Sequence, residues 1–482
     1  MAPFRNSRLK VHLIGLGGIG VSALARWFLA QKWAVSGSDT ARSQIIQDLK
    51  KDGLKVKIGH KTANLPKGAD LVIRSLVISN SNPEIKAARK LGLTVLSYPE
   101  ALGRLTKTYD TIAVSGSHGK STTTAIVSLI LKKAGYDPTV ILGTKLKEFG
   151  DKNFLSGKSD WLVIEADEWQ AAFLNYSPFI SMVTNIDEEH LDFYKNLSRL
   201  KKTFLKFLER TREGGALVLN RDDKNLYSLR SAIVRIAKAR KLKVRWYSTR
   251  IRSNSKRIRA KLRIPGEHNV SNALAAFALT RLLRIPEKIT LRVISEYRGA
   301  WRRMEYRGLW HIAKSKSQKR HKQLAISSVL VYDDYAHHPT EIKATLKAFR
   351  EKFPSQPLIC VFQPHQAKRL ARLFGQFQTA FEEADIAIIL PVYEVAGRDK
   401  FNKKFTSQTL VRVIQKKQPK KLVFYLQNPK NLKRALITLI STLKPKTYSP
   451  RSSESGAGNP KPIVAMMGAG DIVNYTKRLL SP

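Results

Sequence analysis

The chain has 482 residues, more than one ordinary hydrophobic core can organise, and this length indicates about three domains. Its only cysteine, Cys360, excludes an intramolecular disulfide and a cysteine-rich metal site, and it favours a reducing, cytoplasmic setting. No stretch approaches 18 uncharged apolar residues, so we expect no transmembrane helix.

The net charge is strongly positive, because 86 Lys and Arg stand against 37 Asp and Glu, which gives +49. Clustered cations are typical of proteins that bind nucleic acid or anionic membranes. A generally basic composition combined with a polyanionic substrate explains the same charge. We favour the second interpretation and expect no obligate nucleic-acid partner, because net charge bears on solubility and nonspecific binding rather than on the fold.

The first hundred residues alternate short apolar runs with helical patterns, which is typical of βαβ units and a parallel sheet. The predicted strands are Val11–Leu16, Ala34–Gly37, Val56–Ile58, Leu71–Ile73 and Thr94–Leu96. A polar stretch at 106–110 then marks a boundary, so we predict a first domain over residues 1–107.

The same alternation continues in a second predicted domain, residues 108–300. Its predicted strands are Thr111–Val114, Trp161–Glu165, Ile180–Thr184 and Ala216–Asn220. For the basic stretch 230–263 we predict a helix, a strand and a solvated β excursion, ended by Pro265. A helical pattern follows at Val270–Leu283.

A third domain is predicted over residues 301–482, again with alternating elements. Its predicted strands are Val329–Tyr332, Leu358–Phe362, Ile386–Leu390, Leu422–Tyr425 and Ile463–Met467. The Lys- and Ser-rich segment 313–322 and the Pro-, Ser- and Gly-rich segment 444–461 indicate insertions or mobile loops. The fold class predicted for the whole chain is therefore α/β.

A phosphate-binding loop is indicated between the strand 111–114 and the helical pattern 125–131. Its sequence is Gly116-Ser117-His118-Gly119-Lys120-Ser121-Thr122. Such a turn directs backbone N–H groups and a helix N-terminus at phosphate, while the Lys contacts the β and γ phosphates and the hydroxyl reaches Mg²⁺. Val114 stands where the full pattern has Gly, so the motif is shortened. We predict that the chain uses ATP.

A second glycine-rich turn follows the first predicted strand, with Gly15, Gly17, Gly18 and Gly20 in the pattern G-x-G-x-x-G. Asp39 comes about twenty residues later, after the second strand, where it could hold a ribose hydroxyl. A tight structural turn without a ligand remains open. Because ATP has no role in a simple dehydrogenase, we favour the pyrophosphate of a nucleotide-sugar over that of NAD.

Acidic side chains end two strands of the second domain. Glu165, Asp167 and Glu168 follow one strand, and His190 lies among several acids after the next. Parallel sheets present ligands at the carboxyl ends of their strands, and hard oxygen donors suit Mg²⁺. We therefore predict a metal site there.

Two polar clusters follow strands of the third domain. The first runs from Asp333 through Tyr335, His337 and His338 to Glu341, and its spacing is not that of a structural zinc site, so we favour substrate positioning or proton transfer. The second, Phe362-Gln-Pro-His365-Gln366-Ala-Lys368-Arg369, carries cations that suit recognition of a carboxylate.

In this order, these motifs resemble those of the Mur ligases, and the resemblance runs over nearly the whole chain. Within that family it is closest to the members that join L-alanine to UDP-N-acetylmuramate. The motifs that carry it are His12-Leu-Ile-Gly-Leu-Gly-Gly-Ile-Gly-Val-Ser22, Ser36-Gly-Ser-Asp39, Gly116 to Thr122, Glu165-Ala-Asp-Glu168, Thr184-Asn185 with His190, His268-Asn269-Val-Ser-Asn272, Arg302-Arg303, Asp333 to Glu341 and Phe362-Gln-Pro-His365.

The resemblance implies three domains: an N-terminal Rossmann-like domain that binds the UDP-sugar, a central P-loop ATPase domain and a C-terminal Rossmann-like domain that brings the amino acid. It implies ATP and Mg²⁺ as cofactors, and a monomer or homodimer. The implied reaction activates the lactyl carboxylate of UDP-N-acetylmuramate as an acyl phosphate, which the amine of L-alanine then attacks, in peptidoglycan precursor synthesis.

The resemblance also implies roles for single residues. The implied catalytic residues are Lys120, His190, Arg303, with Arg302 beside it, and His337. The implied ATP site comprises Gly116, Ser117, His118, Gly119, Lys120, Ser121, Thr122, Asn269 and Asn272, the two asparagines at the adenine. The implied metal ligands are Ser121 and Glu165 for one ion and His190 for a second. The implied UDP-sugar site comprises Gly15, Gly17, Gly18, Gly20, Ser22, Ser38, Asp39 and Ser75. The implied amino-acid site comprises Tyr335, His337, His365 and Arg369.

One position departs from the family pattern, because Gln366 stands where the alanine-adding members carry an Arg that binds the amino acid's carboxylate. Arg369 or Lys368 could compensate. Two alternatives stay open. One is a murein peptide ligase, which joins a tripeptide to the same nucleotide, and the other is a basic nucleic-acid-binding protein on a retired ligase scaffold.

Overall fold

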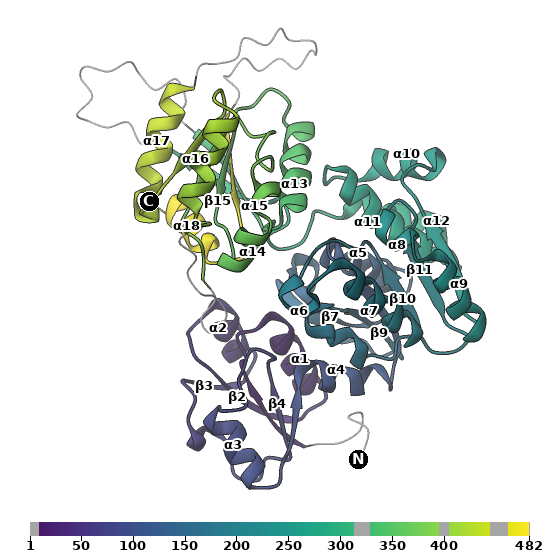
Figure 1. Ribbon diagram of the computed structural model, residues 1–482. Helices are drawn as coiled ribbons and strands as arrows, with labels where there is room; N and C mark the ends of the chain where they lie inside the picture. Colours follow the sequence, from purple (N-terminus) through teal and green to yellow (C-terminus); the bar gives the residue numbers. More distant parts are fainter. Residues whose placement is uncertain (1–8, 313–327, 395–403, 444–460, 482) are drawn as a thin grey trace. The chain divides into compact units, whose positions relative to one another are not determined.

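The computed structural model describes residues 9–312, 328–394, 404–443 and 461–481 (Figure 1). These residues form two compact units, one containing the described residues up to 263 together with 269–300, the other containing 264–268 and the described residues from 301 onward. The loop predicted at 313–322 and nearly all of that predicted at 444–461 lie outside the described residues.

The first sheet of the N-terminal unit has five parallel strands in the order β3-β2-β1-β4-β5. Its strands are β1 (Lys10–Ile14), β2 (Ala34–Asp39), β3 (Lys55–Ile58), β4 (Leu71–Arg74) and β5 (Thr94–Ser97). The accompanying helices are α1 (Ile19–Ala30), α2 (Gln44–Lys51), α3 (Pro83–Lys90) and α4 (Tyr98–Thr106), with a 3₁₀ turn at Thr62–Asn64. β1 is buried over Val11–Ile14 because strands pair with it on both sides.

The second sheet of the same unit has seven strands in the order β12-β11-β10-β6-β9-β7-β8. They are β6 (Asp110–Ser115), β7 (Thr139–Leu146), β8 (Lys152–Leu155), β9 (Trp161–Glu165), β10 (Ile180–Val183), β11 (Ala216–Asn220) and β12 (Lys243–Tyr247). Within this sheet, only the β7–β8 pair is antiparallel among the described pairings. The helices are α5 (Lys120–Lys133), α6 (Leu191–Tyr194), α7 (Leu197–Glu209), α8 (Lys224–Tyr227), α9 (Arg230–Ala239), α10 (Arg252–Lys261), α11 (Glu267–Leu282) and α12 (Glu287–Glu296), with 3₁₀ segments at Lys147–Phe149 and Trp169–Asn175.

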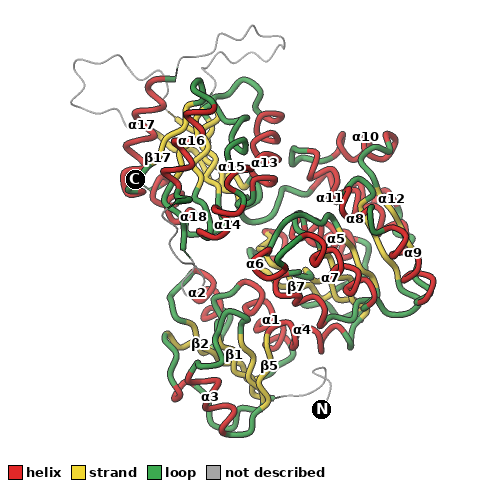
Figure 2. Tube along the Cα trace, in the orientation of Figure 1, coloured by secondary structure: helices red, strands yellow, loops and turns green. Residues whose placement is uncertain are grey.

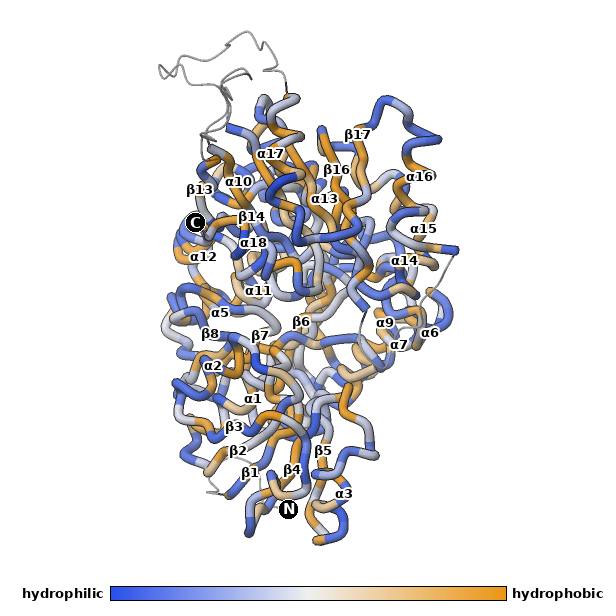
Figure 3. The backbone as a smooth tube through the Cα atoms, turned by 90° about the vertical axis from the view of Figure 1, so that its left-hand side faces the viewer, coloured by the Kyte–Doolittle hydropathy of each residue, from blue (hydrophilic) through white to orange (hydrophobic). Residues whose placement is uncertain are grey.

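The sheet of the C-terminal unit has six strands in the order β13-β14-β18-β15-β16-β17. Helices accompany its strands (Figure 2). They are β13 (Glu305–His311), β14 (Ser328–Asp334), β15 (Leu358–Phe362), β16 (Ile386–Ile389), β17 (Leu422–Tyr425) and β18 (Ile463–Met467). The helices are α13 (Pro339–Lys352), α14 (Ala367–Arg372), α15 (Phe374–Phe377), α16 (Ser407–Lys417), α17 (Leu432–Thr442) and α18 (Ile472–Leu480), with a 3₁₀ turn at Pro429–Asn431. Hydrophobic stretches coincide with strands such as β16 (Figure 3), where every residue is buried.

The α/β class is confirmed, with three mostly parallel sheets. One sheet lies in each of the three ranges predicted as domains, while the boundaries themselves stay a prediction. Loops at the carboxyl ends of β1, β6, β9, β10, β14 and β15 carry the predicted site residues, as expected for sheets of this kind.

The β excursion predicted within residues 230–263 is wrong, because α10 occupies Arg252–Lys261 after the predicted helix and strand. Its buried residues, Ser255 and Ile258, are three positions apart and so share one helical face, and α10 contacts α12. The many Lys and Arg residues of α10 hid the helical spacing of these buried residues in the sequence. Sequence patterns also missed β7, β8 and β13.

Candidate active site

The phosphate-binding loop connects β6 to α5, as the sequence predicts. Gly116 and Gly119 have φ values of +133° and +83°, a region that side chains rarely adopt. A Cβ at Gly116 would collide with the Thr184 hydroxyl, and one at Gly119 with the side-chain amide of Asn272 on α11. Both glycines are therefore required by close packing, and Asn272 lies directly against the loop.

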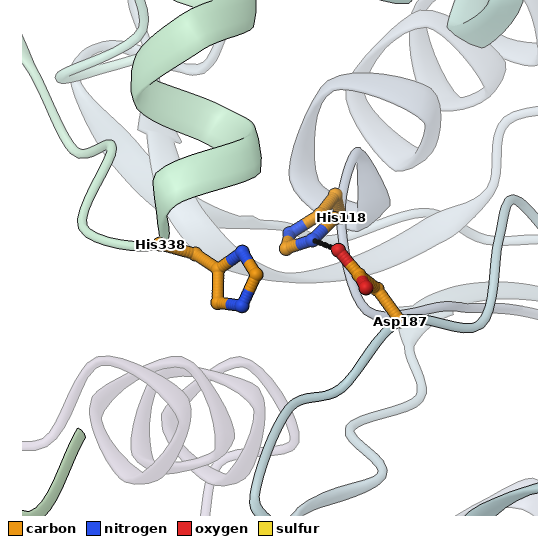
Figure 4. Close-up of side chains that lie close together, drawn as sticks. All are labelled: His118, Asp187 and His338. Atoms are coloured by element: carbon orange, nitrogen blue, oxygen red, sulfur yellow. Dashed lines mark hydrogen bonds and ion pairs between the residues drawn. The ribbon is translucent and has the colours of Figure 1, made fainter. Parts of the chain in front are cut away.

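The residues after β10 hold this loop in shape. The His118 N–H donates to Asn185 Oδ1 at 2.8 Å, and the Thr184 hydroxyl donates to the His118 carbonyl at 2.6 Å. The His118 ring also meets Asp187, with Nε2 and Oδ2 2.9 Å apart (Figure 4). The side chain of His118 is thus fixed by a carboxylate, although the sequence assigned it only to ATP binding.

Lys120 opens α5 and points back into the loop. Its ammonium donates to the Gly116 carbonyl at 2.7 Å and to Glu168 Oε2 at 2.9 Å. Burial alone would lower the pKa of Lys120, but the carboxylates of Glu168, Asp167 and Glu165 raise it above its ordinary value. Lys120 is therefore cationic, and it faces the space that a phosphate loop encloses.

Ser121 and Glu165, predicted to bind one metal ion, lie in contact. The Ser121 hydroxyl donates to Glu165 Oε2 at 2.9 Å, and the Gly143 N–H donates to Oε1 at 2.6 Å. A carboxylate and a hydroxyl beside a phosphate loop are the oxygen donors that Mg²⁺ prefers. The pair therefore fits the predicted ion.

The second predicted ligand, His190, lies with two acids rather than alone. Ligand atoms of His190, Asp167 and Glu168 all lie within 4.8 Å of one another. His190 has φ +53°, an uncommon value for a residue other than glycine, and its Nε2 is 3.6 Å from Glu168 Oε1. The structure thus brings His190 together with Asp167 and Glu168, the acids that the sequence analysis had singled out after the neighbouring strand.

The N-terminal glycine loop, between β1 and α1, is held from the end of β2. The N–H groups of Gly15 and Leu16 both donate to the Ser38 carbonyl, and the Gly17 N–H donates to Asp39 Oδ2 at 2.7 Å. Gly18 forms the N-cap of α1, and Ser75 lies against Gly15. The Asp39 carboxylate thus holds the loop through its hydrogen bond with the Gly17 N–H.

Ser22 and Ser38, both predicted to bind the UDP-sugar, are buried, and their hydroxyls are hydrogen-bonded within the protein. The Ser22 hydroxyl donates to the Ile19 carbonyl and accepts from Asn153. The Ser38 hydroxyl donates to Glu84, which also receives His12 Nε2 at 2.7 Å. Burial would raise the pKa of Glu84, but these hydrogen bonds hold it below its ordinary value. In this structure both serine hydroxyls therefore form hydrogen bonds with protein groups near the loop.

Tyr98, at the start of α4, packs against the N-terminal glycine loop. A Cβ at Gly20 would lie 2.8 Å from the Tyr98 ring, so glycine is required there. Burial and then the charges of Glu165 and Asp167 raise the pKa of the Tyr98 hydroxyl. Tyr98 therefore packs against the glycine loop, and its hydroxyl is subject to the charges of the acids at the end of β9.

The four residues predicted to bind the amino acid gather within the C-terminal unit. The rings of His337 and His365 are 6.0 Å apart, and those of Tyr335 and His337 are 5.4 Å apart. Arg369 Nη1 lies 3.2 Å from His365 Nδ1. This cluster joins the carboxyl ends of β14 and β15 through Pro364 and the start of α14.

Two further residues adjoin this cluster: Glu341, which the sequence analysis had singled out, and Tyr393, which it had missed. Tyr393 stacks on His365 with ring centroids 5.6 Å apart, and Glu341 Oε2 lies 3.2 Å from His337 Nδ1. Tyr393 follows β16 with no recognisable motif. Gln366 has φ +70°, and its N–H donates to the Tyr393 carbonyl at 3.0 Å, so backbone geometry as well as side-chain chemistry constrains this position.

Arg302 and Arg303, predicted side by side, have different surroundings. Arg302 is buried, and its Nη2 donates to the carbonyls of Gly468 and Gly470 after β18. Arg303 is only half-buried, and its guanidinium lies 5.1 Å from the Tyr335 ring centroid. Both guanidinium groups lie about equally far from that ring, 5.0 Å for Arg302, so the two arginines differ in burial and not in this distance.

Asp333, at the end of β14, gives the C-terminal unit a predicted pH dependence. Burial raises its pKa from 3.8 to about 6, although Thr476 and Arg307 oppose the shift. Between these values the folded state binds more protons than the unfolded state, so stability increases as pH falls from about 6 to about 4.

We expect Asp333→Asn to remove that increase, on the order of 3 kcal/mol in the local opening free energy. Hydrogen–deuterium exchange of β14 and β18 amides at the two ends of this pH range would measure it. Glu351→Gln, which removes an exposed carboxylate from α13, should keep the wild-type dependence. The same dependence in Asp333→Asn would contradict the assignment.

Comparison with known proteins identifies three matching segments. Residues 10–110 match the Mur ligase family catalytic domain, 114–280 the Mur ligase middle domain, and 319–445 the Mur ligase glutamate ligase domain. These segments contain the glycine loop, the phosphate loop and the histidine cluster.

Individual proteins match over most of their length. The UDP-N-acetylmuramate--L-alanine ligase of Persephonella marina is 38% identical over 81% of this chain and 83% of its own. The ligase of the same name from Caldanaerobacter subterraneus is 34% identical, and the match covers 98% of this chain and 97% of that ligase. A crystal structure of UDP-N-acetylmuramate-alanine ligase from Thermotoga maritima, 26% identical, covers 98% of both chains with a TM-score of 0.73.

Among the described helices, none is long and apolar enough to cross a membrane.

Proposed function

The chain belongs to the Mur ligase family, and we propose that it joins L-alanine to the lactyl carboxylate of UDP-N-acetylmuramate at the expense of ATP, in the cytoplasm. The observation that carries this proposal is the N-terminal unit's own arrangement. In that unit, Lys120 donates to the Gly116 carbonyl of the phosphate loop, and Tyr98 packs against Gly20 of the glycine loop while the charges of Glu165 and Asp167 raise the pKa of its hydroxyl.

The phosphate loop would bind ATP. Backbone N–H groups at the start of α5 face the phosphates, Lys120 neutralises charge on the group being transferred, and Asn269 and Asn272 are proposed at the adenine. Ser121 and Glu165 would hold one Mg²⁺, and His190 with Asp167 and Glu168 a second. When bound, Mg²⁺ supplies a Lewis acid that draws charge from the phosphate oxygens.

The lactyl carboxylate must be activated before an amine can attack it, because a carboxylate is a poor electrophile. The lactyl carboxylate would attack the γ-phosphorus, giving an acyl phosphate and ADP. The amine of L-alanine then attacks the acyl carbon, and phosphate leaves from the tetrahedral intermediate. Arg303 would contact the transferred phosphate, and His337 would assist the attack.

The amino acid would bind at the cluster of Tyr335, His337, His365 and Arg369. Because Gln366 brings no charge, the carboxylate of L-alanine needs another cation. Arg369 lies against His365, whereas Lys368 is exposed, so we propose Arg369 for this role.

We expect Arg369→Ala to raise KM for L-alanine about 10- to 100-fold with little change in KM for ATP, because a charge-assisted contact to the carboxylate is lost. Steady-state kinetics of the purified protein would measure this. Lys368→Ala on the same helix is the control and should stay within about twofold of wild type. Equal effects of the two substitutions would exclude Arg369 as the carboxylate contact.

The function itself is tested by phosphate release from ATP with Mg²⁺ and UDP-N-acetylmuramate, using L-Ala, L-Ser, Gly and the stem tripeptide in parallel. Release with L-Ala is the expected result. Release only with the tripeptide would select the murein peptide ligase alternative. If no acceptor led to phosphate release, the alternative of a nucleic-acid-binding protein on a retired ligase scaffold would be favoured.

A further inference from the structure

A pocket of about 620 Å³ lies in the N-terminal unit, at the edge of the seven-stranded sheet. Its lining comes from the end of β11, from α8 and α9, and from β12. The lining residues are Arg221, Tyr227, Arg230, Ser231, Val234 and Trp246. The volume is in the range of sites that bind small molecules, and none of these residues belongs to the proposed reaction.

The pocket combines two planar cations with two aromatic rings. The guanidinium carbons of Arg221 and Arg230 lie 5.7 and 5.1 Å from the Tyr227 ring centroid. The Trp246 ring meets Tyr227 edge-on, with centroids 5.5 Å apart. Neither arginine forms an ion pair with any carboxylate in the part of the chain that the structure describes. Both cations are therefore available to an anion.

The surrounding sequence is the most basic stretch of the chain. Residues 221–263 contain 16 Lys and Arg and two acids, a net charge of +14 in 43 residues, against +49 for all 482. Both acids are engaged within the protein. Asp223 accepts the Leu226 N–H at 2.7 Å and caps α8, and Asp222 accepts from Ser248 and Thr249, each at 2.6 Å. The potential over the pocket is therefore strongly positive.

This pocket is distinct from the proposed ATP site. Side chains alternate along β12, so Trp246 and Tyr247 point to opposite faces of the sheet. Trp246 packs on the core that contains Phe204 of α7 and Ile233 of α9. The Tyr247 hydroxyl instead lies beside Ser271 of α11, the helix whose Asn272 contacts the phosphate loop. The pocket and the proposed adenine contacts thus lie on opposite faces of the sheet.

We propose that this pocket binds a nucleoside phosphate, with the base stacked on Trp246, Tyr227 against the edge of the base, and the phosphate between Arg221 and Arg230. Aromatic rings bind any base through its π face, and guanidinium groups match phosphate geometry. The ligand is either a free mononucleotide or one unit of a single-stranded nucleic acid. The basic surface around the pocket would also attract the flanking phosphates of a strand.

The test uses two probes on the full-length protein, with the ATP and UDP-sugar sites saturated by ADP and UDP-N-acetylmuramate. dTMP is measured by calorimetry, and a fluorescent oligothymidylate of roughly 12 nucleotides by anisotropy at about 50 mM salt. An abasic oligomer of equal length and charge is the third arm. The variants are Arg221→Ala/Arg230→Ala and Trp246→Leu, and Arg235→Ala, an exposed cation of α9 outside the pocket, is the control.

We expect about tenfold or greater weakening in the arginine double variant and in Trp246→Leu, and no more than about threefold in Arg235→Ala. The arginine double variant should keep wild-type ligase activity and thermal stability, because both side chains are exposed. Binding of dTMP would identify a free nucleotide as sufficient, and binding of the oligomer alone would identify a strand. Failure of both probes, equal weakening by Arg235→Ala, or equal binding of the abasic oligomer would overturn the proposal.

Discussion

Replacing Lys120 by Ala is expected to lower kcat for ATP-dependent ligation by roughly 10³-fold, while binding of UDP-N-acetylmuramate stays within about twofold of wild type. The reason is geometric. The ammonium is held at the loop by the Gly116 carbonyl and by Glu168. Phosphate release and calorimetry with the UDP-sugar would measure the two quantities.

The same substitution leaves the buried carboxylate of Glu168 without its ammonium partner, which lowers stability as well. Two controls separate this from catalysis. Lys133→Ala removes an exposed cation from the end of α5 and should leave kcat unchanged. Lys120→Arg keeps the charge and should restore thermal stability more fully than activity. A Lys120→Ala protein that is folded and retains more than about a tenth of wild-type kcat would contradict the proposed role.

The adjacent arginines should separate catalysis from folding. We expect Arg303→Ala to lower kcat about 100-fold with an unchanged melting temperature, because its half-buried guanidinium is proposed to contact the transferred phosphate. Arg302→Ala should instead destabilise the C-terminal unit by about 2–4 kcal/mol. It leaves the carbonyls of Gly468 and Gly470 without their charged donor and removes a buried side chain.

Thermal unfolding and steady-state kinetics of the two variants distinguish these effects. Arg303→Lys keeps a cation near Tyr335 and should recover part of the lost kcat, since charge matters there more than the guanidinium's shape. Partial loss of activity in Arg302→Ala should follow the fraction unfolded. If Arg302→Ala were fully stable and as inactive as Arg303→Ala, the division between the two residues would be wrong.

Much of the fold was readable from local patterns. Continuous apolar runs such as Leu358–Phe362 become strands because both faces of a central parallel strand are buried. Less regular elements were missed. β13 pairs antiparallel with β14 through a register shift near Gly308, and its exposed residues break the apolar pattern. In α10, the arginines and lysines concealed the few apolar residues that define its buried face.

The sequence by itself determined the loops that carry chemistry. Gly116, Gly119 and Lys120 show in order and spacing what a phosphate loop needs, because the loop is a local structure whose backbone angles depend on its own residues.

The tertiary structure alone decided which distant residues meet. It placed Glu168 on Lys120, Tyr98 against Gly20, Tyr393 on His365, and Arg302 on the carbonyls of Gly468 and Gly470. These side-chain contacts depend on sheet order and helix packing. Both are set by interactions between residues that are distant in the sequence, so local residue spacing does not reveal them.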